Sequence, residues 1–84
     1  MTWIKAGRLF TRAKDIKEYY YRPTRDEKGN EFYEFWAIRY DDKKIKLGKK
    51  KLRSDAEADA IIRQLLSQEK DTLKLVIDFD EVNV

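Results

Sequence analysis

The sequence predicts an α+β domain in which an antiparallel sheet of three to five strands packs against one amphipathic helix in the C-terminal half. Aromatic and β-branched residues alternate with polar ones in the first half, and a capping pattern at Ser54 precedes apolar residues at helical spacing. With 84 residues, 42% hydrophobic and 42% charged, the chain suits a single domain of residues 1–84. We expect the order β-β-β-α-β, and an extra N-terminal strand is an open alternative.

The predicted sheet begins with two aromatic-rich segments. Residues 16–22 and 31–40 have the composition of strands, and the loop of residues 24–30, which contains Gly29, joins them as a hairpin. A short polar turn at residues 41–43 leads to a third strand, in which Ile45 and Leu47 alternate with lysines. Residues 3–10 lack clean alternation and contain Gly7, so a strand there remains an alternative.

The helix is the clearest periodic feature of the chain. Ser54 and Glu57 have the spacing of a capping box, in which their side chains satisfy free backbone amides at a helix start. One apolar stripe follows, formed by Ala58, Ile61, Ile62, Leu65 and Leu66. After the helix, apolar residues alternate with polar ones over residues 73–79, which predicts a last strand in the same sheet.

Composition excludes several classes of function. The chain has no cysteine and no histidine, so it lacks the usual ligands of zinc, and no stretch approaches the roughly 20 apolar residues of a membrane span. We expect a cytoplasmic protein without cofactor, metal or catalytic site. Asp78 and Asp80, with Glu81, are the only dense carboxylate group, and they fit a solvent-facing strand better than a magnesium site.

Charge is distributed unevenly along the chain, whose formal net charge is +3. Residues 43–53 contain seven basic residues and no acid, whereas residues 71–84 contain four acids and one lysine. If the helix covers Trp36, Ile38, Ile45 and Leu47, the opposite face of the sheet combines cations with aromatic rings. Such a face suits nucleic acid, because cations displace counterions from phosphates and rings stack on bases.

The candidate nucleic-acid-binding residues follow from this arrangement. They are Arg22, Tyr33, Phe35, Arg39, Lys44, Lys46, Lys49, Lys50 and Lys51. Two alternatives stay open. The lysines can belong to a solvated sheet edge while Tyr33 and Phe35 lie under the N-terminal segment. The chain can also be a protein-interaction module, since it has more aromatic rings than one small core needs.

Residues 19–66 resemble the arm-type DNA-binding domain at the N-terminus of phage and transposon tyrosine integrases, a three-stranded sheet backed by one helix. The resemblance lies in residues 20–22, 36–40, 45–48 and 54–58. It implies that the exposed sheet face enters the major groove of duplex DNA through Arg22, Arg39, Lys44 and Lys46. It also implies a phage or mobile-element accessory protein. The separate alternative of a protein-interaction module includes, as one example, a phage-encoded modulator of a host protein. The predicted last strand and the acidic tail depart from that family, and these 84 residues contain no recombinase catalytic domain.

Overall fold

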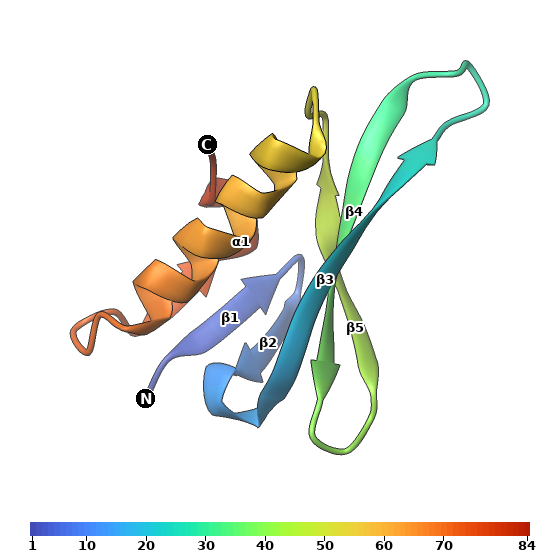
Figure 1. The fold of residues 1–84 in the computed structure, drawn as a ribbon. Coiled ribbons are helices and arrows are strands. Elements are labelled where there is room, and N and C mark those ends of the chain that lie inside the picture. Colours follow the sequence, from blue (N-terminus) through green and yellow to red (C-terminus); the bar gives the residue numbers. More distant parts are fainter.

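The computed structural model describes all residues, 1–84, and contains two three-stranded sheets and one helix (Figure 1). Sheet A has the order β2-β1-β6 and consists of β1 (Trp3–Ala6), β2 (Leu9–Arg12) and β6 (Val76–Asp78). Sheet B has the order β3-β4-β5 and consists of β3 (Ile16–Arg25), β4 (Glu31–Arg39) and β5 (Lys44–Lys50). Helix α1 spans Asp55–Glu69, and short 3-10 turns form η1 (Ala13–Asp15) and η2 (Phe79–Glu81). The predicted α+β class is therefore confirmed. No helix of the structure combines the length and the apolar character needed to cross a membrane.

Sheet B contains the three strands that the sequence predicts, and all of its pairs are antiparallel. β3 continues to Arg25, past Pro23, and shortens the predicted loop. Proline is tolerated there because β3 is an edge strand, whose outward positions need no N–H donor. In the remaining loop, the carboxylate of Asp26 accepts hydrogen bonds of 2.9 Å from the backbone N–H groups of Lys28 and Asn30.

Sheet A bears out the alternative of an extra N-terminal strand, with two strands instead of one, and corrects the placement of the last strand. The N-terminal segment forms a hairpin of two strands, and Gly7 has the positive φ of 63° that its turn requires. β6 pairs in parallel with β1, so the last strand joins sheet A instead of extending the main sheet. The predicted strand of residues 73–79 is also too long, because Leu73 is 88% exposed and lies outside β6. Phe79 instead begins η2, which carries it into the core.

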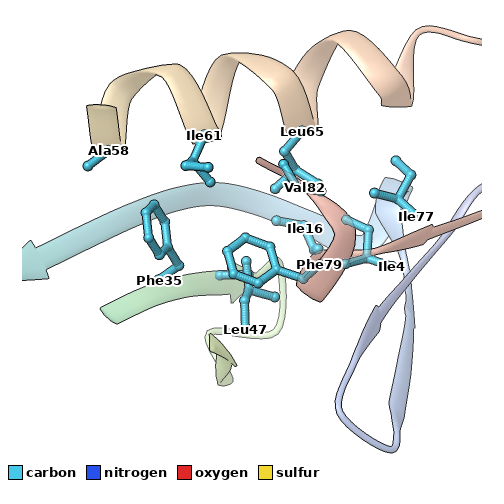
Figure 2. Close-up of a cluster of buried hydrophobic side chains, with 11 residues drawn as sticks. Ile4, Ile16, Phe35, Leu47, Ala58, Ile61, Leu65, Ile77, Phe79 and Val82 are labelled. Carbon is cyan, nitrogen blue, oxygen red and sulfur yellow. The ribbon is translucent and has the colours of Figure 1, made fainter. Parts of the chain in front are cut away.

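The core lies between α1, the inner face of sheet B and the two ends of the chain (Figure 2). Its eleven buried residues are Ile4, Ile16, Phe35, Ala37, Leu47, Ala58, Ile61, Leu65, Ile77, Phe79 and Val82. The helix begins where the sequence predicts, since the Ser54 hydroxyl accepts a bond from the Glu57 N–H and the Glu57 carboxylate accepts one from the Arg53 N–H. The predicted apolar stripe is confirmed at its centre, whereas Leu66 at its margin is 41% exposed.

Three tyrosine hydroxyls join sheet B to carboxylates of α1. The hydroxyl of Tyr21 donates to Asp59 at 2.6 Å, and that hydrogen bond raises the pKa of Tyr21 to about 12. Tyr33 donates to Asp55 in the first turn, and Tyr19 donates to Glu69 near the other end of the helix. Because each bond needs a protonated hydroxyl and an ionised carboxylate, these contacts add polar links to an interface otherwise formed by apolar packing.

The orientation of β4 differs from the prediction. The sequence suggests that Trp36 and Ile38 face the helix, but the buried side chains are those of Phe35 and Ala37, both with no exposed surface. The ring of Phe35 packs against that of Phe79, with centroids 5.3 Å apart. Aromatic and apolar residues occupy both faces of this strand, so alternation alone does not distinguish the inner face from the outer one.

A β-bulge in β5 controls which lysines share a face. Phe35 pairs with Gly48 and Trp36 pairs with Lys46, which leaves Leu47 as the extra residue between them. Leu47 is buried, while Gly48 has a φ of 155° and lies against the Phe79 ring. A Cβ atom at position 48 would be 3.3 Å from Cδ2 of that ring, so the contact favours glycine. The bulge therefore depends on close packing between β5 and η2.

The two phenylalanines of β4 provide a test of this orientation. We expect Phe35→Ala to lower the free energy of unfolding by about 3–5 kcal/mol, because it removes a fully buried ring. Phe32→Ala removes the same group from the opposite, partly exposed face and is expected to cost about 1 kcal/mol. Urea unfolding followed by circular dichroism measures both. Equal losses would contradict the observed orientation of β4.

Candidate nucleic-acid interface

The face of sheet B that points away from α1 is the candidate interface, and we call it the outer face. The strand register places on it Glu18, Tyr20, Arg22, Thr24, Phe32, Glu34, Trp36, Ile38, Lys44, Lys46 and Lys49. Four of these side chains are cations, two are carboxylates and three are aromatic rings. The bulge at Leu47 produces this set, because Lys46 and Lys49 would lie on opposite faces of a regular strand.

Trp36 occupies the middle strand of the outer face, with aromatic and cationic neighbours around it. The ring of Tyr20, on the adjacent strand, stacks beside it with an interplanar angle of 8° and a centroid distance of 6.3 Å. The guanidinium of Arg22 lies 5.7 Å from the Trp36 ring centroid, and the ammonium of Lys46 lies 5.9 Å from it. These are cation–π distances, so the two charges are held beside the ring.

Glu34 lies between the same two cations. Its carboxylate is 2.7 Å from Nε of Arg22 and 3.3 Å from Nζ of Lys46, and its side chain is 12% exposed. The Trp36 indole N–H also donates to it, at 3.4 Å. These hydrogen bonds, that of Arg22 first, lower the pKa of Glu34 from its ordinary 4.5 to about 2. Glu34 is therefore ionised at neutral pH.

The remaining cations of the outer face lie toward its two ends. Lys44 pairs with Ile38 at one end, and Lys49 pairs with Glu34 nearer the other. The ammonium of Lys49 is 5.1 Å from the ring centroid of Phe32. Both lysines are exposed, and neither belongs to any of the six ion pairs of the structure. They are thus available to an external anion.

The structure brings together four of the residues predicted for binding. Arg22, Lys44, Lys46 and Lys49 all lie on the outer face. Sequence reasoning missed its aromatic members, because Trp36 was expected under the helix and Tyr20 and Phe32 were not selected. It also missed the carboxylate of Glu34. The alternation of β4 groups Phe32, Glu34 and Trp36 on one face, but that face was expected to lie on the helix side.

The predicted aromatic members of the site lie on the inner face. Phe35 is fully buried beneath α1 and beside Phe79, so it cannot stack on a base. The hydroxyl of Tyr33 donates to Asp55 at 2.7 Å, and that bond raises the pKa of Tyr33 to about 12. Phe35 is thus covered, but by the helix and the C-terminal segment and not by the N-terminal one, while Tyr33 is only half-buried.

The other predicted cations are placed differently. Lys50 lies beside Phe79, with its ammonium 4.7 Å from the ring centroid, and partial burial lowers its pKa. Nε of Arg39 lies 3.2 Å from the carboxylate of Asp41, at the turn between β4 and β5. Lys51 is exposed just beyond the end of β5. Lys50 and Arg39 are thus not part of the outer face, and Lys51 lies past its last paired residue.

The carboxylates near the C-terminus do not share a strand face. Asp78 lies 3.6 Å from the ammonium of Lys5, and as the N-cap of η2 it accepts a hydrogen bond from the backbone N–H of Asp80. Asp80 is exposed beyond the last residue of β6. No group of three or more acidic residues is arranged to hold a metal ion.

No family model, curated protein or solved structure matches the chain. The geometry of the site is therefore the basis for a functional proposal. The outer face offers planar rings for stacking and exposed ammonium groups for anions, with one ionised carboxylate near its centre. This is an arrangement for noncovalent binding of an anionic ligand that also has planar groups.

The low pKa of Glu34 predicts a specific pH dependence of stability. A carboxyl group whose pKa is lower in the folded state stabilises the fold above the unfolded-state value, and that contribution disappears as pH falls through the folded-state value. We expect Glu34 to stabilise the protein above pH 4.5 and to lose this effect near pH 2. Glu34→Gln should be less sensitive than the wild type between these pH values. Carboxyl NMR titration and acid unfolding measure this, and a Glu34 midpoint near 4.5 would contradict it.

Proposed function

We propose that this protein binds nucleic acid, with duplex DNA as its preferred form, through the outer face of sheet B. The observation that carries the proposal is the Trp36 ring on a sheet face that the helix leaves open, with the unpaired ammonium groups of Lys44 and Lys49 on the same face. Ammonium groups replace counterions on phosphates, and an aromatic ring stacks on a base or packs against a sugar. One face thus offers contacts to both parts of a nucleotide.

The spacing of the unpaired lysines favours a duplex. Lys44 pairs with Ile38 and Lys49 pairs with Glu34, so four residues of β4 separate their positions along the sheet. At about 3.3 Å per residue this separation is about 13 Å, close to the width of about 12 Å of the major groove of B-DNA. Small sheets in other proteins enter that groove. We therefore place the outer face against the groove, with Lys44 and Lys49 toward the phosphates.

The resemblance to integrase arm-type domains points to the same surface. It implicates Arg22, Lys44 and Lys46, all three on the outer face, whereas Arg39 belongs to the turn beside Asp41. It is also the basis for proposing a phage or mobile-element origin, while the composition is the basis for proposing a cytoplasmic protein without a catalytic role.

Reversing the charge of the two unpaired lysines tests the proposal. We expect the wild type to bind a mixed-sequence duplex at micromolar or tighter concentrations in low salt, with affinity falling steeply as salt rises. Lys44→Glu with Lys49→Glu should weaken binding at least about tenfold and flatten the salt dependence, since two phosphate contacts are lost. Fluorescence anisotropy with duplex DNA, single-stranded DNA and RNA measures the affinities.

The matched control is Lys14→Glu with Lys70→Glu, which makes the same change in net charge at two exposed positions outside sheet B. The control should retain most of the affinity. Similar losses in both double variants would assign binding to net charge alone. No binding by the wild type at low salt would refute the proposed function.

A second candidate function is supported by sheet A. Its outward-facing residues include Trp3, Phe10 and Val76, and Leu75, directly before β6, is 68% exposed. Exposed apolar groups gathered on one sheet are typical of protein-docking surfaces. We therefore keep the alternative of a protein-interaction module, such as a modulator of a host protein, with sheet A as its contact surface.

Variants of sheet A separate this alternative from nucleic-acid binding. Phe10→Ser with Leu75→Ser should reduce capture of a specific protein from a host extract while leaving duplex affinity unchanged. Pull-down with mass spectrometry, compared with the Lys44→Glu and Lys49→Glu protein, is the measurement. Capture that is equal for the wild type and the sheet A variant would contradict this alternative.

A further inference from the structure

Glu34 is an unusual residue at the centre of a surface proposed to bind a polyanion. It contacts Arg22 and Lys46 at once, and its side chain is only 12% exposed, compared with 62% and 44% for those two cations. Glu18 is the other acid of the outer face, but it is exposed and belongs to no ion pair. The two carboxylates thus have the same charge and face but different contacts.

The contacts of Glu34 divide the cations of the outer face into two classes. Arg22 and Lys46 already contact the carboxylate of Glu34. To bind a phosphate closely, each must either give up this contact or keep it beside the phosphate. Lys44 and Lys49 have no such partner. A backbone phosphate therefore gains less from the cations beside Trp36 than from the two lysines toward the ends.

We propose that Glu34 is an internal competitor for phosphate, which withholds Arg22 and Lys46 from the nucleic-acid backbone and reserves the centre of the outer face for a nucleobase. This inference rests on the proposed function and adds a division of labour within the same site. Lys44 and Lys49 contact phosphates, while Trp36, kept beside two partly neutralised cations, contacts a base. Glu34 thereby reduces the share of affinity that is independent of sequence.

The geometry supports this role in two further respects. Arg22 and Lys46 remain within cation–π distance of Trp36 while bound to Glu34, so the carboxylate also keeps them beside the ring. The pKa of Glu34 is lowered to about 2, so the competitor stays ionised throughout the physiological pH range. The partial neutralisation is therefore a constant property of the surface.

The test compares Glu34→Gln with Glu18→Gln, which remove one negative charge each from the same face. Salt-dependent anisotropy with a mixed-sequence duplex is the first measurement. Glu34→Gln should bind about tenfold more tightly at low salt and should steepen the slope of log affinity against log salt by about one to two, because two cations become free to bind phosphates. Glu18→Gln should change both quantities less. Equal changes in the two variants would overturn the inference.

Elution from immobilised heparin is the second measurement, because heparin is a polyanion without bases. Glu34→Gln should elute at higher salt than Glu18→Gln if Glu34 withholds two cations from external anions. If the wild type binds no duplex but this difference in elution persists, the proposed function fails and the competition by Glu34 stands. If the wild type binds duplex and the two variants behave alike on heparin and duplex, only the inference about Glu34 fails.

A converse pair of variants keeps the inference testable if Glu34→Gln does not fold, which thermal unfolding would reveal. Lys46→Gln removes a cation already paired with Glu34, whereas Lys49→Gln removes an unpaired one. We expect the Lys49 variant to lose several times more duplex affinity than the Lys46 variant. Equal losses, or a larger loss for Lys46→Gln, would show that Glu34 does not withhold its partner from phosphate.

Discussion

The packing of the Phe79 ring against Gly48 is the contact on which the arrangement of the molecule depends. It joins η2 to β5 at the position where β5 contains its extra residue, and the lack of a side chain at Gly48 allows the ring to approach the backbone. The same ring contacts Phe35, so the inner face of sheet B, the bulge and the C-terminal segment are coupled. A bulge changes which residues share a face, and here it aligns Lys44, Lys46 and Lys49 with Trp36.

The two faces of sheet B use aromatic residues for different purposes. On the inner face, Phe35 is fully buried, while Tyr19 and Tyr21 hold α1 through bonds to its carboxylates. On the outer face, Trp36 and Tyr20 stack beside cations that no core contact requires. Carboxylates of the helix thus accept hydrogen bonds from tyrosines of sheet B, whereas Lys44, Lys46 and Lys49 of β5 lie at the surface. This separation of charge explains how a chain of modest net charge presents a basic face.

Prediction from the sequence succeeded where the signal is local. The Ser54 cap, the stripe around Ile61 and the strands of sheet B follow from capping chemistry and periodicity, and the structure contains all of them. It failed for β4, because Phe35 and Trp36 suit burial equally well. It failed also for the last strand, because Leu75 and Ile77 have the same pattern but only Ile77 meets a partner, Ile4, in sheet A. As a result, the predicted aromatic residues of the site, Tyr33 and Phe35, lie on the inner face, and the rings of the outer face were not predicted.

By itself, the sequence determined the class of fold, the helix and the basic character of β5, since each depends on residues close together in the chain. Only the tertiary structure decided which aromatic rings are open to a ligand. That outcome depends on the bulge at Leu47 and on Phe79, which lies 31 positions after Gly48 and packs against it. Alternation specifies that a strand has two faces, but the inner face is the one against which other elements pack, here α1 and Phe79. For this reason Trp36 and Glu34 became recognisable as the centre of the candidate interface only in the folded protein.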